Sequence, residues 1–212
     1  MLELKDISFS ADGKKILNHI NLKIDNNKFI VMTGPNGGGK STLAKMIAGI
    51  NIPTQGKILF DGEDITTMPI YQRAQKGVAF AFQQPVRFKG ITVKDLIALS
   101  ANQQINEKKM CGYLFDVGLC PKDYLKREVN TNLSGGEIKR IEIATVLARN
   151  AKLTIFDEPE AGIDLWSFNH LIAIFQKLRE QQEGSILVIS HQERILEIAD
   201  EIIVLANGQI SK

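Results

Sequence analysis

Hydrophobic residues along this chain follow two patterns, one typical of strands and the other of helices. Near the N-terminus apolar and polar residues alternate over residues 2–9 and again over residues 20–24, with Asp12-Gly13 between the two runs. Such alternation indicates strands with one buried face, and an Asp-Gly pair favours a tight turn. The first part of the sequence therefore predicts antiparallel strands.

Four later runs are almost entirely apolar, which is typical of strands buried on both faces. They lie at residues 29–32, 77–82, 153–156 and 186–189. Stretches with apolar residues three and four positions apart stand between these runs and predict helices. Strands that alternate with helices in this way predict a mainly parallel α/β sheet, whose ligands bind at the carboxyl ends of the strands.

The segment from residue 84 to residue 149 has a different character, because its patterns predict helices alone. Thr92 and Asp95 have the spacing of a capping box before an apolar stretch, and residues 108–117 predict a further helix. We therefore expect an α/β core made of residues 1–83 and 150–212, with an inserted helical subdomain of residues 84–149.

Composition limits the class of protein. The chain has 212 residues with 26 basic and 24 acidic side chains, so its net charge of +2 does not favour nucleic acid as a partner. Its two cysteines, Cys111 and Cys120, lack the spacing of a zinc or redox site. No apolar block resembles a signal peptide, and no run reaches the ~18 residues that span a bilayer. We expect a soluble, cytoplasmic protein.

Residues 34–42 carry the strongest chemical pattern, and they stand between a predicted strand and a predicted helix. The spacing is that of a P-loop, in which glycines let backbone N–H groups surround a phosphate. Lys40 would reach the terminal phosphates and the Ser41 hydroxyl would ligate Mg²⁺. We therefore expect a nucleoside triphosphate to bind here. The expected binding residues are Gly34, Pro35, Asn36, Gly37, Gly38, Gly39, Lys40, Ser41 and Thr42.

Further polar residues follow the other buried runs. Gln83 follows residues 77–82, Asp157-Glu158 follows residues 153–156, and His191 comes soon after residue 189. Because the carboxyl ends of parallel strands meet at one edge of a sheet, we expect these residues to join the P-loop in one site. Asp157 is placed to hold Mg²⁺ through its water shell, and Glu158 is a candidate general base.

Residues 133–137, Leu-Ser-Gly-Gly-Glu, resemble the signature motif of ATP-binding-cassette (ABC) ATPases. The resemblance implies a head-to-tail homodimer that forms with ATP, in which each ATP lies between the P-loop of one chain and the signature motif of the other. It adds Ser134, Gly135, Gly136 and Glu137 to the expected ATP contacts. A serine followed by two glycines at a helix N-terminus would itself form a second phosphate-binding nest.

The same resemblance extends over essentially the whole chain. Gln83 corresponds to the Q-loop glutamine, residues 161–164 to the D-loop, and His191 to the switch histidine that contacts the γ-phosphate. It implies a P-loop NTPase fold and hydrolysis of ATP with Mg²⁺, with Glu158 and His191 as catalytic residues. The expected metal ligands are Ser41, Gln83 and Asp157.

One departure from the family concerns the base of the nucleotide. Family members usually place an aromatic residue near Ser10 or Ala11 to stack on adenine, but the nearest aromatic here is Phe9. The adenine contact therefore stays open.

Four stretches indicate a branch within the family. Residues 81–86, 134–140, 162–164 and 191–196 look like those of the SufC-type ATPase of SUF iron-sulfur cluster assembly. That resemblance implies a soluble scaffold of the SufB or SufD kind as the partner. The alternative is a subunit that energises a membrane transporter, which would have the same catalytic residues.

The segment from Gln84 to Gly90 is the expected docking surface for that partner. It leads from Gln83 into the helical insertion, and Pro85 within it would serve as a hinge. Val86 and Phe88 beside basic residues suit a mixed interface. The alternative is that both side chains pack beneath the insertion.

Overall fold

The structure is a computed structural model that describes residues 1–84, 86–101, 104–130, 132–181 and 184–211. The chain divides into two compact units, which are described one at a time. The first contains Met1–Phe80, Lys152–Asp157 and Gly184–Lys212, and the second contains Ala81–Ala151 and Glu158–Glu183. The expected helical insertion, residues 84–149, falls in the second unit, which also takes in residues 158–183. The division into domains expected from the sequence stays a prediction.

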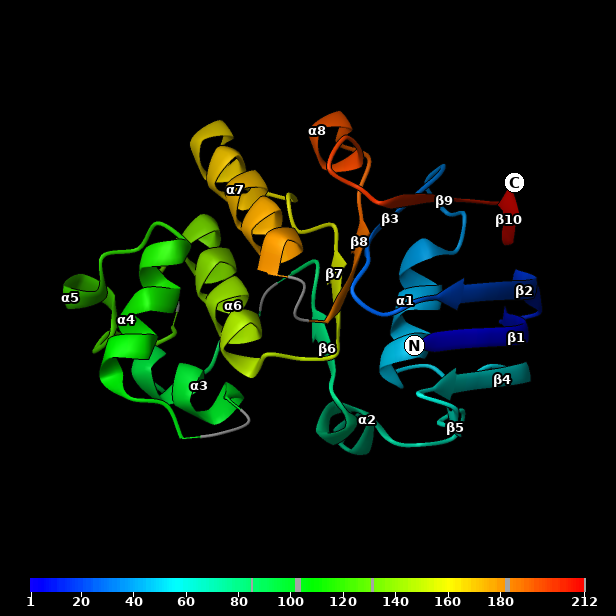
Figure 1. Ribbon diagram of the computed structural model, residues 1–212, viewed down its shortest axis with the longest axis horizontal. Helices are drawn as coiled ribbons and strands as arrows, with labels where there is room; N and C mark the ends of the chain where they lie inside the picture. The colour runs from blue at the N-terminus through cyan, green and yellow to red at the C-terminus, as the bar shows by residue number, and fades with distance from the viewer. Residues whose placement is uncertain (85, 102–103, 131, 182–183, 212) are drawn as a thin grey trace. The chain divides into compact units, whose positions relative to one another are not determined.

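The N-terminal strands of the first unit form a four-stranded sheet in the order β2-β1-β4-β5, which Figure 1 shows. Its strands are β1 (Leu2–Ala11), β2 (Lys14–Ile24), β4 (Gln55–Phe60) and β5 (Glu63–Asp64). Their pairing is antiparallel, with Leu4 opposite both Leu22 and Ile58. The alternation over residues 2–9 and 20–24 therefore predicted strands β1 and β2 correctly, although a register shift follows Leu4 in β1.

A six-stranded sheet has the order β10-β9-β3-β8-β7-β6. Its strands are β3 (Phe29–Thr33), β6 (Val78–Ala81), β7 (Leu153–Asp157), β8 (Ser185–Ile189), β9 (Glu201–Ala206) and β10 (Gln209–Ser211). β3 pairs in parallel with β8 and β9, β7 pairs in parallel with β8, and β10 pairs with β9 in the antiparallel direction. Every residue of β7 and β8 is buried, as their largely apolar runs predicted. The predicted α/β class with a mainly parallel sheet is confirmed.

Among its described residues, the first unit has three helices: α1 (Lys40–Ala48), α2 (Ile70–Lys76) and α8 (Glu193–Leu196). Arg73 of α2 is fully buried and holds the end of α1. Its guanidinium donates to the carbonyl oxygens of Met46 at 2.6 Å and Ile47 at 3.0 Å, and also to those of Thr66 and Met68. A cation at a helix C-terminus complements the helix dipole.

Burial disfavours the charged form of this arginine and lowers the pKa of Arg73 to about 10. Four carbonyl groups stabilise the buried guanidinium by accepting hydrogen bonds from it. Nothing in the spacing of α2 predicted this contact, because it depends on the approach of two helices.

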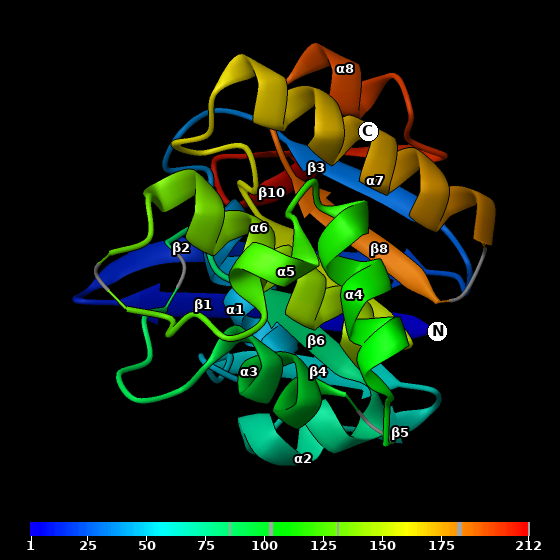
Figure 2. The ribbon, with the colours of Figure 1, turned by 90° about the vertical axis from the view of Figure 1, so that its left-hand side faces the viewer.

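The second unit contains five helices among the residues that the structure describes, and Figure 2 shows α3 to α6 as a cluster. They are α3 (Val93–Ser100), α4 (Glu107–Asp116), α5 (Pro121–Tyr124), α6 (Gly135–Arg149) and α7 (Leu165–Gln181). α6 contacts both α3 and α4, and each of these helices has buried apolar residues, such as Ile141, Ile97 and Leu114 respectively. The capping box predicted for Thr92 and Asp95 is present at the start of α3.

We expect Arg73→Met to lower the free energy of unfolding by about 2–4 kcal/mol, because buried carbonyl groups would lose a charged donor. Urea denaturation of the wild type and the variant measures this difference. The control is Lys76→Met on the same helix, since Lys76 pairs with Glu63 at the surface and should contribute less than about 1 kcal/mol. Equal stabilities for the two variants would contradict this account of Arg73.

Candidate functional site

The P-loop lies so close to its neighbours that only glycine fits at several of its positions. A Cβ atom on Gly34, whose φ is 134°, would stand 2.1 Å from the carbonyl oxygen of Leu205 in β9. A Cβ atom on Gly39, whose φ is 100°, would stand 2.6 Å from a side-chain carbon of Leu17. Real side chains do not tolerate such distances, and positive φ values favour glycine. The glycine spacing in the sequence therefore reflects the close contact of this loop with β9 and β2.

This loop places an uncapped helix N-terminus next to a buried lysine. Gly39 precedes α1 and supplies no side-chain cap, and the first turn of α1 contains no acidic residue. The backbone N–H groups of a first turn point outward and attract anions. Lys40 is buried, and its Nζ donates to the carbonyl oxygens of Gly34 at 2.7 Å and Pro35 at 3.0 Å. The arrangement can bind phosphate, as the P-loop pattern predicts.

Ser41 and Asp157 meet at the carboxyl end of the parallel sheet. The Ser41 hydroxyl donates to Oδ1 of Asp157 at 2.8 Å, and Asp157 is only 2% exposed. A hydroxyl and one carboxylate fit Mg²⁺, which takes few protein ligands and keeps several waters. Among the described residues, no three His, Cys, Asp or Glu side chains gather as they would for a metal held by protein alone. These two residues therefore fit the predicted magnesium site.

Strand order explains why residues distant in sequence can share the edge of this sheet. β3, β8 and β7 are consecutive neighbours, and the P-loop, His191 and Asp157 lie at or just beyond their carboxyl ends. His191 is exposed and stands two residues after β8. The preceding Ser190 is buried, and its hydroxyl accepts the N–H of Gln192 at 3.0 Å. This bond holds the turn that presents His191.

In the second unit, the two other predicted site residues contact each other. The amide of Gln83 donates to Oε2 of Glu158 at 2.5 Å. Glu158 has a φ of 46°, in the left-handed region that residues other than glycine rarely adopt. The N–H of Ala161 donates to the Glu158 carbonyl at 3.0 Å and closes this turn. Strained backbone of this kind is typical of functional sites. Gln83 thus orients the carboxylate that the sequence predicts to be catalytic.

A buried ion pair on α6, absent from the sequence predictions, holds the residue before Gln83. Lys139 and Glu142 lie 2.9 Å apart, and Lys139 is only 1% exposed. Lys139 donates to the carbonyl of Phe82, and Glu142 accepts the N–H of the same residue at 2.9 Å. Burial raises the pKa of Glu142, although Lys139 opposes that shift. One turn of α6 therefore secures both backbone groups of Phe82.

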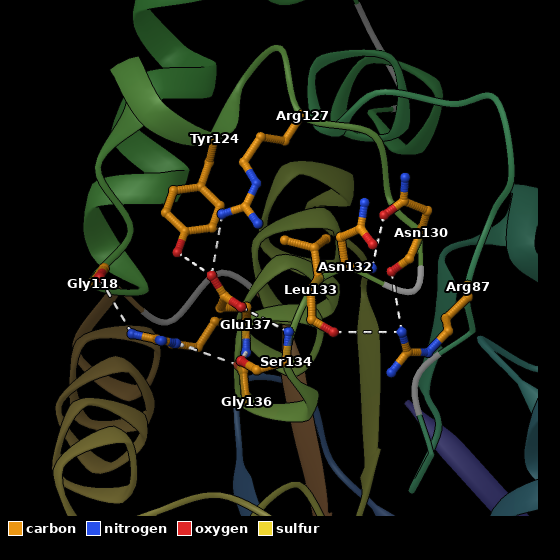
Figure 3. Close-up of polar contacts among 11 residues, drawn as sticks. Arg87, Gly118, Tyr124, Arg127, Asn130, Asn132, Leu133, Ser134, Gly136 and Glu137 are labelled. Carbon is orange, nitrogen blue, oxygen red and sulfur yellow. Dashed lines mark hydrogen bonds and ion pairs between the residues drawn. The ribbon is translucent and has the colours of Figure 1, made fainter.

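The signature motif forms the N-terminus of α6, which Figure 3 shows. Ser134 is the N-cap, and its Oγ accepts the N–H of Glu137 at 3.2 Å. Oε2 of Glu137 accepts the N–H of Ser134 at 2.7 Å and completes a capping box. A Cβ atom on Gly135 or Gly136 would meet nothing within 4 Å. A ligand or a second chain therefore has room to approach this helix end.

Three residues that the motif comparison did not single out support this helix end. Tyr124 and Arg127 contact the carboxylate of Glu137, and Arg127 does so at 3.3 Å. The hydrogen bond from Tyr124, helped by that from Ser134, lowers the pKa of Glu137 to about 2. Arg87 donates to the carbonyl oxygens of Asn130 at 3.1 Å and Leu133 at 3.4 Å. Their positions depend on the fold of the loop, which no spacing rule predicts.

The position expected to stack on adenine contains no aromatic residue. Phe9 is partly buried and packs against the hydrophobic core of the first unit, while Ser10 is exposed. The ring of Phe9 therefore forms part of the core packing.

Comparison with known proteins identifies relatives over the whole chain. A family model described as ABC transporter matches residues 17–161. An uncharacterized ABC transporter ATP-binding protein of Methanocaldococcus jannaschii is 40% identical over 100% of this chain and 88% of its own length. A lipopolysaccharide export system ATP-binding protein of Haemophilus influenzae is 29% identical over 99% of this chain and 88% of its own length.

A solved structure has the same fold. It is a dimeric ATP-binding cassette in a post-hydrolysis state, bound to ADP and Pi, with a TM-score of 0.86 and 23% identity over 100% of this chain and 97% of the other. Across the described residues, none of the helices combines the length and the apolar character needed to cross a membrane.

The lowered pKa of Glu137 predicts a pH-dependent contribution to stability. Its ionised form is favoured in the folded protein, so the contribution is fully present above the ordinary glutamate pKa of about 4.5. It is lost as the pH falls from about 4.5 toward the folded-state pKa of about 2. Glu137→Gln should therefore be less stable than the wild type at pH 7, and the difference should shrink below pH ~4. Urea denaturation across this range measures it, and a difference independent of pH would contradict the assignment.

Proposed function

The chain belongs to the ABC transporter family and is an ATP-hydrolysing ABC ATPase, and we propose that two copies of it bind each ATP between them. The observation that carries the proposal is the presence of two separate helix N-termini suited to phosphate. One is the P-loop with α1, and the other is the signature motif with α6. Both ends offer backbone N–H donors. One ATP can use both ends if they come from different chains.

In this proposal the P-loop of one chain binds the phosphates of ATP. Lys40, which donates to the carbonyl oxygens of Gly34 and Pro35 in this structure, would donate to the terminal phosphates instead, and the N–H groups of the first turn of α1 would surround them. Ser41 and Asp157 would hold Mg²⁺, and Gln83 is the third ligand expected from the sequence. When bound, the ion would supply electrostatic stabilisation for the charge that develops on the transferred phosphoryl group.

Glu158 and His191 are the proposed catalytic residues. Glu158 follows the buried Asp157 directly in the chain, and its left-handed backbone turns its carboxylate toward the amide of Gln83. It would accept a proton from the attacking water or orient that water. His191 would donate a hydrogen bond to the γ-phosphate from its exposed position beyond β8.

Hydrolysis would drive a conformational change in a partner. The comparisons support a transporter subunit, since the relatives described above are named as ATP-binding proteins of transport systems. The interpretation as an ATPase for iron-sulfur cluster assembly, with a SufB- or SufD-like scaffold, rests on short sequence stretches alone. We therefore favour a membrane transport protein as the partner and keep the scaffold as the alternative.

The surface beside Gln83 remains the proposed docking site. Val86 is 49% exposed and Phe88 is 37% exposed, so neither side chain is buried beneath the helices of the second unit. The N–H of Phe88 donates to the carbonyl of Val129 at 2.9 Å, and Arg87 donates to Leu133. The segment is therefore hydrogen-bonded to the loop that leads into the signature motif. A partner that contacts this segment would therefore also act on the loop that leads into the signature motif. The expected hinge, Pro85, lies outside the described residues.

We expect Glu158→Gln to keep ATP binding and to lose turnover by about 10²-fold or more, because the amide cannot accept the proton. Light scattering should show that Mg-ATP drives this variant into dimers, since the bound nucleotide persists. Glu180→Gln on the exposed face of α7 is the control. Wild-type turnover in Glu158→Gln would remove Glu158 from this role, and a monomer at saturating ATP would refute the shared site.

We expect Phe88→Ser with Val86→Ser to reduce co-purification with the partner by about tenfold while basal ATP hydrolysis continues. Arg87 is left unchanged because it supports the signature loop. The control is Leu99→Ser, which removes another exposed apolar side chain, 74% exposed, from the second unit. If a membrane protein no longer co-purifies with the variant, the result supports transport. If a soluble scaffold no longer co-purifies, it supports cluster assembly. Unchanged binding would refute the docking surface.

A further inference from the structure

Both oxygens of the Glu137 carboxylate are engaged, and Figure 3 shows the residues that engage them. Oε2 accepts the N–H of Ser134, whereas Oε1 accepts the hydroxyl of Tyr124 and pairs with Arg127. The guanidinium of Arg127 also lies 4.9 Å from the centre of the Tyr124 ring. The carboxylate is therefore bonded on one side to the helix cap and on the other to a phenol and a cation.

Glu137 presents an electrostatic problem for the function proposed above. The first turn of α1 contains no acidic residue, whereas the first turn of α6 contains this one. The pKa of Glu137 is about 2, so its side chain is ionised at neutral pH. A negative charge stabilises a helix N-terminus but repels a phosphate that approaches the same N–H groups. To bind phosphate, the signature motif would need the Glu137 carboxylate kept away from the phosphate and its negative charge balanced by a cation.

We propose that Tyr124 and Arg127 are positioning residues for ATP at the signature motif, an inference that rests on the shared site proposed above. They hold the carboxylate of Glu137 in its capping position and offset its charge. The N–H groups of Gly135 and Gly136 then face an incoming phosphate without a mobile anion beside them. Without these two residues, the carboxylate turns toward the phosphate and weakens its binding.

The backbone around Arg127 supports this role. The N–H of Arg127 donates to the Tyr124 carbonyl at 2.9 Å, and the Arg127 carbonyl accepts the N–H of Val93 in α3 at 2.9 Å. Tyr124 thus projects from the end of α5, and Arg127 from the short hydrogen-bonded segment that follows it. The side chain of Glu137 is 19% exposed and that of Arg127 is 38% exposed. Water therefore screens the charge of Glu137 only in part, so the orientation of this carboxylate affects a nearby phosphate.

A rescue experiment separates this role from simple structural support. Arg127→Met and Tyr124→Phe are each made alone and together with Glu137→Gln. Glutamine still forms the capping box but carries no charge. We measure the ATP concentration that half-saturates dimerisation in the Glu158→Gln background, together with KM and kcat for hydrolysis without that change. Lys126→Met is the control, because Lys126 is an exposed neighbour absent from the contacts to Glu137 described above.

We expect Arg127→Met to raise both the half-saturating ATP concentration and KM by about fivefold to tenfold, a size typical of coupling between two sites. The change in kcat should be smaller. Tyr124→Phe should raise both by about threefold, through loss of one hydrogen bond to a charged group. Adding Glu137→Gln should return each variant to within about twofold of Glu137→Gln alone, whereas Lys126→Met should match the wild type.

The outcomes are distinguishable. Variants that bind ATP like the wild type, or losses that Glu137→Gln does not rescue, would overturn the inference and leave the shared site standing. A Glu158→Gln protein that does not dimerise with ATP would overturn the shared site and, with it, this inference. Thermal unfolding checks that each variant is folded. Tyr124→Phe removes a single hydroxyl and keeps the test decisive if Arg127→Met does not fold.

Discussion

The close approach of the P-loop to β9 is the constraint on which the first unit depends. The carbonyl of Leu205 leaves no room for a Cβ atom on Gly34 or on Gly38. The loop can therefore leave β3 and start α1 only with glycine at these positions. This path places Lys40 and Ser41 at the start of α1, and it brings Ser41 to within 2.8 Å of Asp157. The proposed phosphate and Mg²⁺ sites thus depend on one tight backbone contact.

The two helix N-termini that would share ATP are built differently. α1 begins after a glycine without a side-chain cap, so its first turn is available to an anion. α6 begins with a capping box whose glutamate stabilises the helix but brings a negative charge. In the proposal above, the contacts of Tyr124 and Arg127 with that glutamate allow the helix cap and phosphate binding to coexist. Without these contacts, the carboxylate of Glu137 would be free to move toward the phosphate.

Family membership determines the chemistry of this protein but not its partner. The roles proposed for the P-loop, Asp157 and Glu158 in ATP hydrolysis are the same whether the partner is a transporter or a scaffold. Partner choice depends instead on surface residues, such as the exposed pair Val86 and Phe88. The comparisons therefore favour transport through the names of the relatives, while the catalytic residues are neutral between the two.

Local patterns in the sequence were enough to predict the strands, the capping box at Thr92 and the P-loop, because each depends on residues close together in the chain. The parallel sheet also predicted that Ser41 and Asp157 would meet, since strand ends share an edge. Only the tertiary structure showed that Arg73 holds the end of α1, and that Tyr124 and Arg127 restrain Glu137. Those contacts join segments whose approach is set by packing, and no periodicity or spacing encodes them.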